Sequence, residues 1–296
     1  MALSEHARNT IKGWLFVSPW VVGFLVFLVV PIGLSLYYSF CDYSLIGRWP
    51  ARWVGWENYR QMWHDPVFWR ALRNTFLYAA LALPAGMVVS LVQALLLNVS
   101  VPGKTVFRTI LFLPSLVPAV AAAVLWAWMF NSRYGLINAV IGKPLSWVHI
   151  SAPNWLADYP LPALALMSLW SVGYTVIILL AGLQNIPREL YEAAVIDGAG
   201  AWRRLWHVTL PTLSPVIFFN LIMALIATFQ VFTVPTLMIK AGLRSDTQFY
   251  SMVIFDQAFT NNHMGYASAM AWVQLLMILG LTGVAFWTSR RWVHYR

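Results

Sequence analysis

Charged residues are scarce in this sequence. Asp, Glu, Lys and Arg make up only 10% of its 296 residues, whereas hydrophobic residues make up 60%. A soluble domain carries roughly 25% charged residues, so we expect most of the surface to face lipid rather than water. The 19 Lys and Arg residues are scattered singly or in pairs. This scatter argues against nucleic-acid binding, despite a formal net charge of +9.

Cysteine and catalytic motifs are also nearly absent. Cys41 is the only cysteine, which excludes an intrachain disulfide and a cysteine-based metal site. The segment "NVSVPGKT" ends like a phosphate-binding P-loop, but Asn98 stands where that motif needs its first glycine. The sequence contains no H-E-x-x-H or G-x-S-x-G motif. We therefore expect no catalytic site, no metal and no cofactor in this chain.

Six long apolar runs dominate the sequence. A helix of about 20 residues crosses the hydrocarbon core of a membrane, and each run is long enough. Prolines inside several runs are tolerated where neighbouring helices or cavity water satisfy the freed carbonyls. The first run is too long for a signal peptide, so we expect it to be a membrane anchor. The predicted fold is an all-α membrane protein with six transmembrane helices, at residues 14–40, 74–97, 109–130, 161–184, 212–239 and 265–288.

None of the six runs contains Asp, Glu, Lys, Arg or His. Ionisable side chains inside a membrane are costly and are kept for proton relays, ion sites and voltage sensing. Their absence argues against a proton-coupled carrier, a voltage sensor and an acid-catalysed intramembrane protease. A sodium-coupled carrier, which can use backbone carbonyls at broken helices, stays open. We expect the energy for any transport to come from outside the membrane part of this chain.

The distribution of basic residues predicts the orientation. Six spans place both termini on one side, together with the connections at 98–108 and 185–211. This side carries ten of the 19 Lys and Arg residues in the shorter total length. Because cytoplasmic connections are enriched in Lys and Arg, we expect both termini to be cytoplasmic.

The polar residues within the spans are neutral, and aromatic residues make up 16% of the chain, including 17 Trp. One interpretation is structural: Trp and Tyr form interfacial belts and amides join helices. The other is a pathway lined by aromatic faces and neutral hydrogen-bonding groups, suited to a neutral polyhydroxylated solute. The candidates for such a pathway are Trp170, Tyr174, Phe229 and Gln230.

One connection, "PRELYEAAVIDGAGAWRRLWHVTLP" at 187–211, gathers many charges. Pro187 suits the first turn of a helix, and Glu189 and Glu192 then lie near its positive end. The spacing predicts a helix over 187–196, a break at Asp197-Gly198, and a second short helix over 201–208. Pro211 is expected to mark the exit into the fifth span.

This connection resembles the EAA motif of the permeases of binding-protein-dependent ABC transporters. One position departs from it: Leu205 stands where the family usually has Phe, although Trp202 and Trp206 flank it. The matching residues are Glu192, Ala193, Ala194, Asp197, Gly198, Ala199, Leu210 and Pro211.

The resemblance implies a mechanical role for the connection. It would form a cytoplasmic coupling helix, between the fourth and fifth spans, that docks in a cleft of a separate ATPase subunit. Glu192 would be the main polar contact, Gly198 would set the turn, and Ala193 with Ala194 would permit close approach. Glu189, Asp197, Ala199, Leu205 and Pro211 complete the implied coupling loop. ATP and Mg would be bound by the partner ATPase.

Three further stretches, 53–78, 107–138 and 264–273, resemble the first permease of the maltose- and glycerol-phosphate-type carbohydrate branch. This implies a heterodimer with a second permease, two copies of an ATPase, an extracytoplasmic solute-binding protein and a sugar substrate. The implied location is the inner membrane of a bacterial or archaeal cell. The expected domains are a tail, span and external segment (1–71), a type-1 importer transmembrane domain (72–287) and a basic tail (288–296).

Alternatives remain at this point. The same type of importer could carry glycerol-phosphate or a polyamine, although a charged solute would want charge near its path. A chain that moves solute without ATP or partners would be an autonomous secondary carrier. A membrane enzyme or scaffold finds no catalytic constellation to support it.

Overall fold

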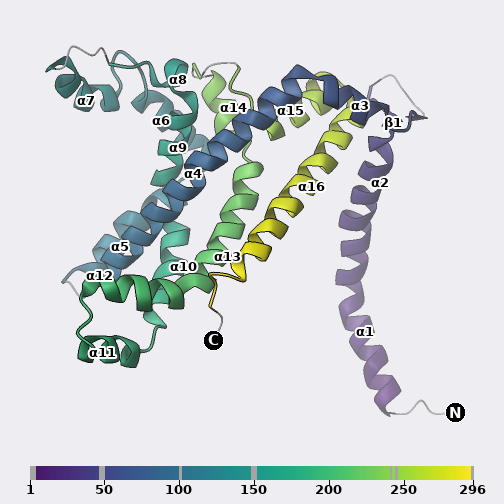
Figure 1. Cartoon of the computed structure of the whole chain (residues 1–296). Coiled ribbons are helices and arrows are strands. Elements are labelled where there is room, and N and C mark those ends of the chain that lie inside the picture. The colour runs from purple at the N-terminus through teal and green to yellow at the C-terminus, as the bar shows by residue number, and fades with distance from the viewer. Residues whose placement is uncertain are drawn as a thin grey trace. The chain divides into compact units, whose positions relative to one another are not determined.

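A computed structural model describes residues 5–46, 51–99, 102–147, 152–240, 242–243 and 246–294. These residues are almost entirely helical (Figure 1), and their only strands are the two-residue β1 and β2. The expected all-α fold is confirmed. The chain forms two compact units: residues up to Asp65 with Ile254–Val273, and Pro66–Val253 with Gln274–Arg296.

The first unit begins with a long apolar helix. It is assigned as α1 (Glu5–Phe24), the π-helical turn η1 (Leu25–Val29) and α2 (Val30–Ser39). Lys12–Ser39 is apolar enough to cross a membrane, and no residue of its most apolar stretch is buried within the chain. Such a surface is stable only in lipid or against a partner.

A short segment with two strands and a helix follows this helix within the first unit. β1 (Cys41–Asp42) pairs antiparallel with β2 (Arg52–Trp53), and α3 spans Glu57–His64. A Cβ on Gly265 would lie 2.0 Å from the Cys41 carbonyl oxygen, so only glycine permits this contact. The π-turn η4 (Asp256–Thr260) and the first turns of α16 complete the unit. Cys41 is buried and free.

The second unit is a bundle around α4 (Pro66–Asn98), which contacts α9, α10 and α13. Its other long helices are α13 (Leu210–Phe229), which α14 (Thr233–Lys240) extends, and the later turns of α16 (Met264–Ser289). The shorter helices are α7 (Leu136–Trp147), α8 (Trp155–Asp158) and α15 (Tyr250–Phe255), the last of which ends in the first unit.

Two of the expected spans are bent pairs of helices. α5 (Lys104–Phe112) with the 3-10 turn η2 (Leu113–Leu116) meets α6 (Ala119–Met129) at 97°, and α9 (Pro160–Trp170) meets α10 (Gly173–Gln184) at 51°. Val117, at ψ 126°, leaves the helical region before Pro118, as a residue preceding proline tends to do. The described residues thus contain four continuous helices long and apolar enough to cross a membrane, or up to six spans if each bent pair is one. The count of six stays a prediction.

Close packing at glycine joins the bundle helices. A Cβ on Gly182 of α10 would lie 2.7 Å from Leu213 Cδ1 of α13, so the two helices approach closely only because this side chain is absent. In lipid, where no hydrophobic effect drives helices together, such small residues permit the backbone approach that gives van der Waals packing.

Candidate functional site

The charged connection begins with the predicted helix. α11 runs Arg188–Ile196 and follows Pro187, whose ψ of 136° places it just outside the helix. Glu189 lies in the first turn, where the helix dipole favours a carboxylate. The prediction of a helix over 187–196 is confirmed to within one residue.

A tight turn held by local hydrogen bonds ends α11. The Gly198 N–H donates to the Val195 carbonyl (3.0 Å) and the Ala199 N–H donates to the Ala194 carbonyl (2.8 Å). This pair of bonds is the Schellman motif, whose turn residue adopts a left-handed conformation that favours glycine. Gly198 has φ +73°. The predicted break at Asp197-Gly198 is confirmed, with a specific reason for glycine.

The second short helix is not separate, so that part of the prediction is wrong. α12 (Ala201–Arg204) continues through the π-turn η3 (Leu205–Thr209) directly into α13. The Leu210 N–H donates to the Leu205 carbonyl, five residues back. We attribute the continuity to this wide turn, which leaves room for the Pro211 ring, where a regular helix would clash. Pro211 therefore lies within a continuous helix and marks no exit.

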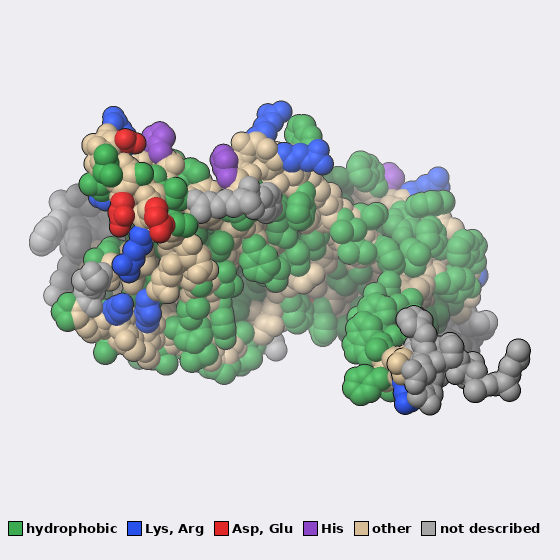
Figure 2. Space-filling view, turned by 90° about the horizontal axis from the view of Figure 1, so that it is seen from below, with side chains coloured by type: hydrophobic (Ala, Val, Ile, Leu, Met, Phe, Trp, Pro, Cys, Tyr) green, Lys and Arg blue, Asp and Glu red, His purple; other side chains and the backbone are tan. Residues whose placement is uncertain are grey.

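We call residues 187–204 the charged knob. It lies at one end of the second unit, beside the end of α10 and the start of α5 (Figure 1). Figure 2, which views this end, shows acidic and basic side chains gathered there. Apolar side chains share the surface: Val195 is 55% and Ile196 85% exposed. Exposed apolar groups beside exposed charges are the composition of a docking surface.

Most of the predicted coupling residues lie in this knob, and Leu205 and Pro211 follow it. Tyr191 ties it to the continuous helix, since its hydroxyl lies 3.0 Å from Thr209 Oγ1. The sequence did not predict this bond or the exposure of Val195 and Ile196. The apolar residues within a charged, exposed motif were the signal that could have indicated this exposure. Glu189, Glu192, Ala193, Asp197 and Gly198 are exposed, whereas Ala194, Ala199, Leu205 and Pro211 are partly buried.

A cavity of about 370 Å³ lies elsewhere in the second unit, where three helical breaks meet. Residues from the bend between η2 and α6, from the bend between α9 and α10, and from the break between α13 and α14 all contribute to its lining. Irregular backbone at membrane depth is tolerated only when it is buried in protein or lines a cavity. The lining residues are Tyr78, Pro114, Ser115, Val117, Ala119, Ala122, Leu164, Met167, Ser168, Trp170, Ser171, Val231, Val234 and Pro235.

The cavity is aromatic and neutral. Its lining offers the Trp170 and Tyr78 rings, together with the hydroxyls of Ser115, Ser168 and Ser171, and no Asp, Glu, Lys, Arg or His. Trp170 lies edge-on to Trp126, with ring centroids 6.0 Å apart. Aromatic faces with neutral hydroxyls suit a solute that has both apolar faces and hydroxyl groups.

The four predicted pathway residues do not come together in this cavity. Trp170 lines it. Tyr174 is 57% exposed and packs edge-on against Phe112, whereas Phe229 is buried against Phe76. Gln230 is exposed at the end of α13. Their shared role in a substrate pathway stays a prediction.

A helix break beside the cavity is stabilised by buried hydrogen bonds. The Phe229 carbonyl, in the last turn of α13, accepts a bond from Gln274 Nε2 (2.6 Å). The same Nε2 donates to Ser251 Oγ (3.0 Å). Carbonyls at a helix end lack intrahelical partners and are expensive to leave unsatisfied inside a membrane. Gln274 therefore maintains this break.

Residues 82–294 match the protein family described as "Binding-protein-dependent transport system inner membrane component". The chain belongs to this family. It is thus an integral inner-membrane permease, and the subunits of this family are not catalytic. The matched residues include the charged knob, both bent pairs and every lining residue of the cavity except Tyr78.

Three relatives are similar to this permease over nearly its whole length. It is 39% identical to "Probable ABC transporter permease protein YesP" of Bacillus subtilis, over 97% of this chain and 93% of that protein. It is 34% identical to the sulfoquinovosyl glycerol transport system permease protein SmoG of Agrobacterium fabrum (91% and 87% covered). It is also 34% identical to the lactose transport system permease protein LacF of Rhizobium radiobacter (95% and 94% covered).

A solved structure shares the fold of this permease. The match is a chain of a bacterial alginate ABC transporter in complex with an alginate pentasaccharide-bound periplasmic protein. The TM-score is 0.80 and the sequence identity 23%, with 96% of each chain covered. At this identity the likeness establishes the fold alone.

Proposed function

We propose that this permease is the membrane-spanning subunit of an ATP-driven ABC importer that translocates a sugar or oligosaccharide. The relatives named for lactose and for sulfoquinovosyl glycerol support a carbohydrate substrate. The observation that carries the proposal is the neutral, aromatic cavity at which three helical breaks meet. Transporters commonly build their substrate sites from such discontinuous helices.

In this proposal the charged knob is the coupling helix. Glu192 is its main polar contact with the partner ATPase, Gly198 holds the turn, and the exposed Val195 and Ile196 supply apolar contact area. Ala193 and Ala194 allow the two surfaces to approach. ATP and Mg are bound by the ATPase, because no P-loop occurs in this chain.

The connectivity explains how a pull on the knob reaches the cavity. α10 begins at Gly173, beside the α9–α10 bend, and ends at Gln184, three positions before Pro187. On the other side of the knob, α12, η3 and α13 form a continuous helix that ends at the break before α14. Helices transmit displacement as nearly rigid rods, and breaks absorb it. Movement of the knob therefore changes the geometry of two of the three breaks.

The proposed assembly contains a second, homologous permease, two copies of the ATPase and an extracytoplasmic solute-binding protein. Both termini and the knob lie in the cytoplasm, as the basic residues predict. The segments 41–70, 131–160 and 240–264 then face the binding protein. The domain boundaries at 71 and 287 stay a prediction within this proposal.

ATP-dependent uptake tests the proposed function. The tagged permease is purified from native membranes with its bound partners and reconstituted into liposomes with the co-encoded binding protein. Labelled neutral sugars, sn-glycerol 3-phosphate and a polyamine are then offered in turn. We expect uptake of a sugar that stops without ATP. If only a charged solute is taken up, that solute and not a sugar is the substrate. Uptake without ATP or partners would identify an autonomous secondary carrier.

A further inference from the structure

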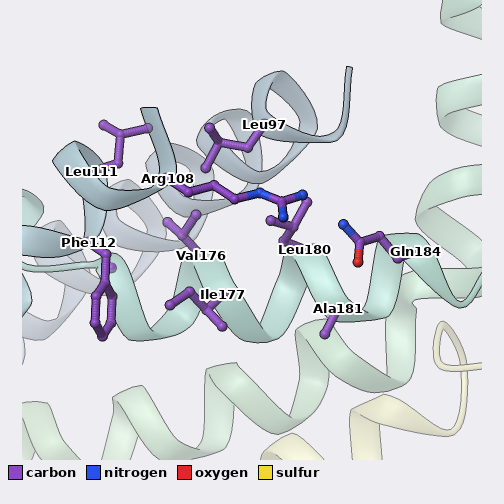
Figure 3. A pocket seen from close by; sticks show the side chains of 10 residues that line it. Leu97, Arg108, Leu111, Phe112, Val176, Ile177, Leu180, Ala181 and Gln184 are labelled. Carbon is purple, nitrogen blue, oxygen red and sulfur yellow. The ribbon is translucent and has the colours of Figure 1, made fainter. Parts of the chain in front are cut away.

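A second pocket, of about 270 Å³, lies between α4, α5 and α10 (Figure 3). Its walls are apolar, with Leu97 from the last turn of α4 and Val176 and Leu180 from α10. Arg108 of α5 also lines it, and none of the lining residues is acidic. Figure 3 shows the Arg108 side chain extended past Val176, with its guanidinium near Leu180 and directed toward Gln184.

One hydrogen-bond donor of Arg108 has no partner among the described residues of this pocket. Its Nε is buried and has no hydrogen-bond acceptor among the described residues. Leaving a buried donor without a partner is costly, and more so in a charged group. The side of a guanidinium formed by Nε and one Nη matches two oxygens of a phosphate or carboxylate. The geometry of Arg108 therefore suits an anion at a defined position in the pocket.

The surroundings of the pocket indicate lipid as the source of that anion. The pocket runs along α10 from Gly173 to Gln184, and the Arg108 guanidinium lies toward its Gln184 end (Figure 3). At this end α4 and α10 finish, which is the level expected for the membrane–water boundary. Phe107 and Ile110 of α5 are 53% and 59% exposed, so apolar surface adjoins the pocket. Lys104, exposed one helical turn before Arg108, adds a second cation on the same face.

We propose that this pocket binds the phosphate headgroup of an anionic phospholipid. The phosphate accepts hydrogen bonds from Arg108 Nε and Nη, and an acyl chain packs on the apolar walls. Basic pockets between transmembrane helices bind such headgroups. The site is independent of the transported solute and requires only that the permease lies in a membrane. Because Gln184 ends the helix that leads into the charged knob, a lipid here links α5 to that helix end.

Native mass spectrometry of retained lipid tests the proposal. The permease is purified with its bound partners, equilibrated with equal amounts of phosphatidylglycerol and phosphatidylcholine, and released from detergent in the instrument. Both lipids offer a phosphate, but phosphatidylcholine also carries a choline cation that Arg108 and Lys104 would repel, so we expect roughly tenfold preference for phosphatidylglycerol. Arg108→Gln should abolish most of this preference. Arg290→Gln, which removes an exposed arginine from the C-terminal tail, should leave it unchanged.

A second variant and a competing anion distinguish a lipid site from a site for a free anion. Arg108→Lys keeps the charge but removes the paired Nε and Nη donors, so we expect an intermediate preference for phosphatidylglycerol. This variant also tests the proposal if Arg108→Gln fails to fold. Inorganic phosphate added at millimolar concentration should not displace the lipid. Displacement by phosphate would indicate a free-anion site. Equal retention of both lipids, an unchanged preference in Arg108→Gln, or a partner subunit's carboxylate filling the pocket in a map of the assembly would overturn the proposal.

Discussion

The charged knob and the neutral cavity, both in the second unit, differ in exposure and in how far apart in the sequence their stabilising residues lie. The knob is exposed, and its turn is held by hydrogen bonds that span no more than five residues, from Ala199 to Ala194. The cavity is lined from five helical segments and their breaks, and the break at Phe229 depends on Gln274, 45 residues away. The comparison separates a locally encoded docking element from a site that exists only after the bundle has packed.

In the proposed function, the knob serves ATP coupling and the cavity serves solute recognition. Charge is placed where a soluble partner can reach it, and it is absent from the lining of the cavity. Variants of the knob should therefore impair the use of ATP and leave solute recognition intact. Variants of the cavity should do the reverse. The following variants each alter either the knob or the cavity and its supporting helix break.

The largest expected effect is on Glu192. Replacing it with Ala removes the main charged contact to the proposed ATPase, and a hydrogen bond to a charged group is worth about 1.5–3 kcal/mol. We expect ATP-driven uptake to fall roughly 10- to 100-fold, with the KM for solute unchanged. Glu57→Ala, which removes another exposed carboxylate, should have no effect. Full uptake in Glu192→Ala would refute the assigned contact.

Gly198→Val should impair coupling through the backbone. The position has φ +73°, and a Cβ there meets no atom within 4 Å, so any penalty comes from conformation and not from a clash. A left-handed conformation costs a non-glycine residue about 1–2 kcal/mol. We expect stimulation of the ATPase by the permease to drop about 5- to 30-fold. Gly200→Ala, at φ −66° with equally open space, is the matched control and should behave as wild type.

Trp170→Ala should impair the cavity and spare the knob. Loss of an aromatic face costs about 0.5–1.5 kcal/mol beyond its area, so the KM for sugar uptake should rise by roughly 2- to 10-fold. ATPase coupling measured at saturating solute should stay unchanged. Trp128→Ala removes a 66% exposed indole that does not line the cavity, and its KM should not change. If both variants behave alike, the cavity is not the solute site.

Gln274→Leu tests the support of the helix break. The Phe229 carbonyl would keep the longer bond from Ser251 Oγ (3.3 Å) but lose the bond from Gln274, and the Ser251 hydroxyl would lose its donor, at a cost of about 1–3 kcal/mol. We expect a drop of a few degrees in Tm, measured by thermal unfolding in detergent. The matched control is Gln93→Leu, because Gln93 Oε1 is buried without a partner among the described residues. That variant should match or exceed wild-type stability; a larger loss there than in Gln274→Leu would contradict this account.

The sequence predicted the local features well. Pro187 and the Asp197-Gly198 pair define α11 and its turn by backbone preferences alone, so both were predictable. Continuity of α12 with α13 was not, because proline usually ends a helix and the π-turn that accommodates Pro211 has no sequence signal of its own. Pro114 and Pro118 made a break in the third run predictable, but proline does not set the size of the bend, which is 97°.

The cavity was predicted less well than the knob. Apolar runs locate spans but do not say which helix face points inward when nearly every face is apolar. Of the predicted pathway residues Trp170 lines the cavity, whereas Phe229 packs in the core and Tyr174 is exposed, and their role in a pathway stays a prediction. Ser115 and Ser168 also line the cavity, although no feature of the apolar runs singled them out.

Site-specific photo-cross-linking from Val195 tests the central claim most directly. A benzophenone amino acid at this exposed position of the knob is activated in native membranes, and adducts are identified by mass spectrometry. The account predicts a single major adduct with a separate ATPase subunit, lost when the probe is moved to the exposed Arg133, on the predicted opposite side. Adducts with lipid alone, or with an extracytoplasmic protein, would contradict the assignment of this loop as the link to ATP.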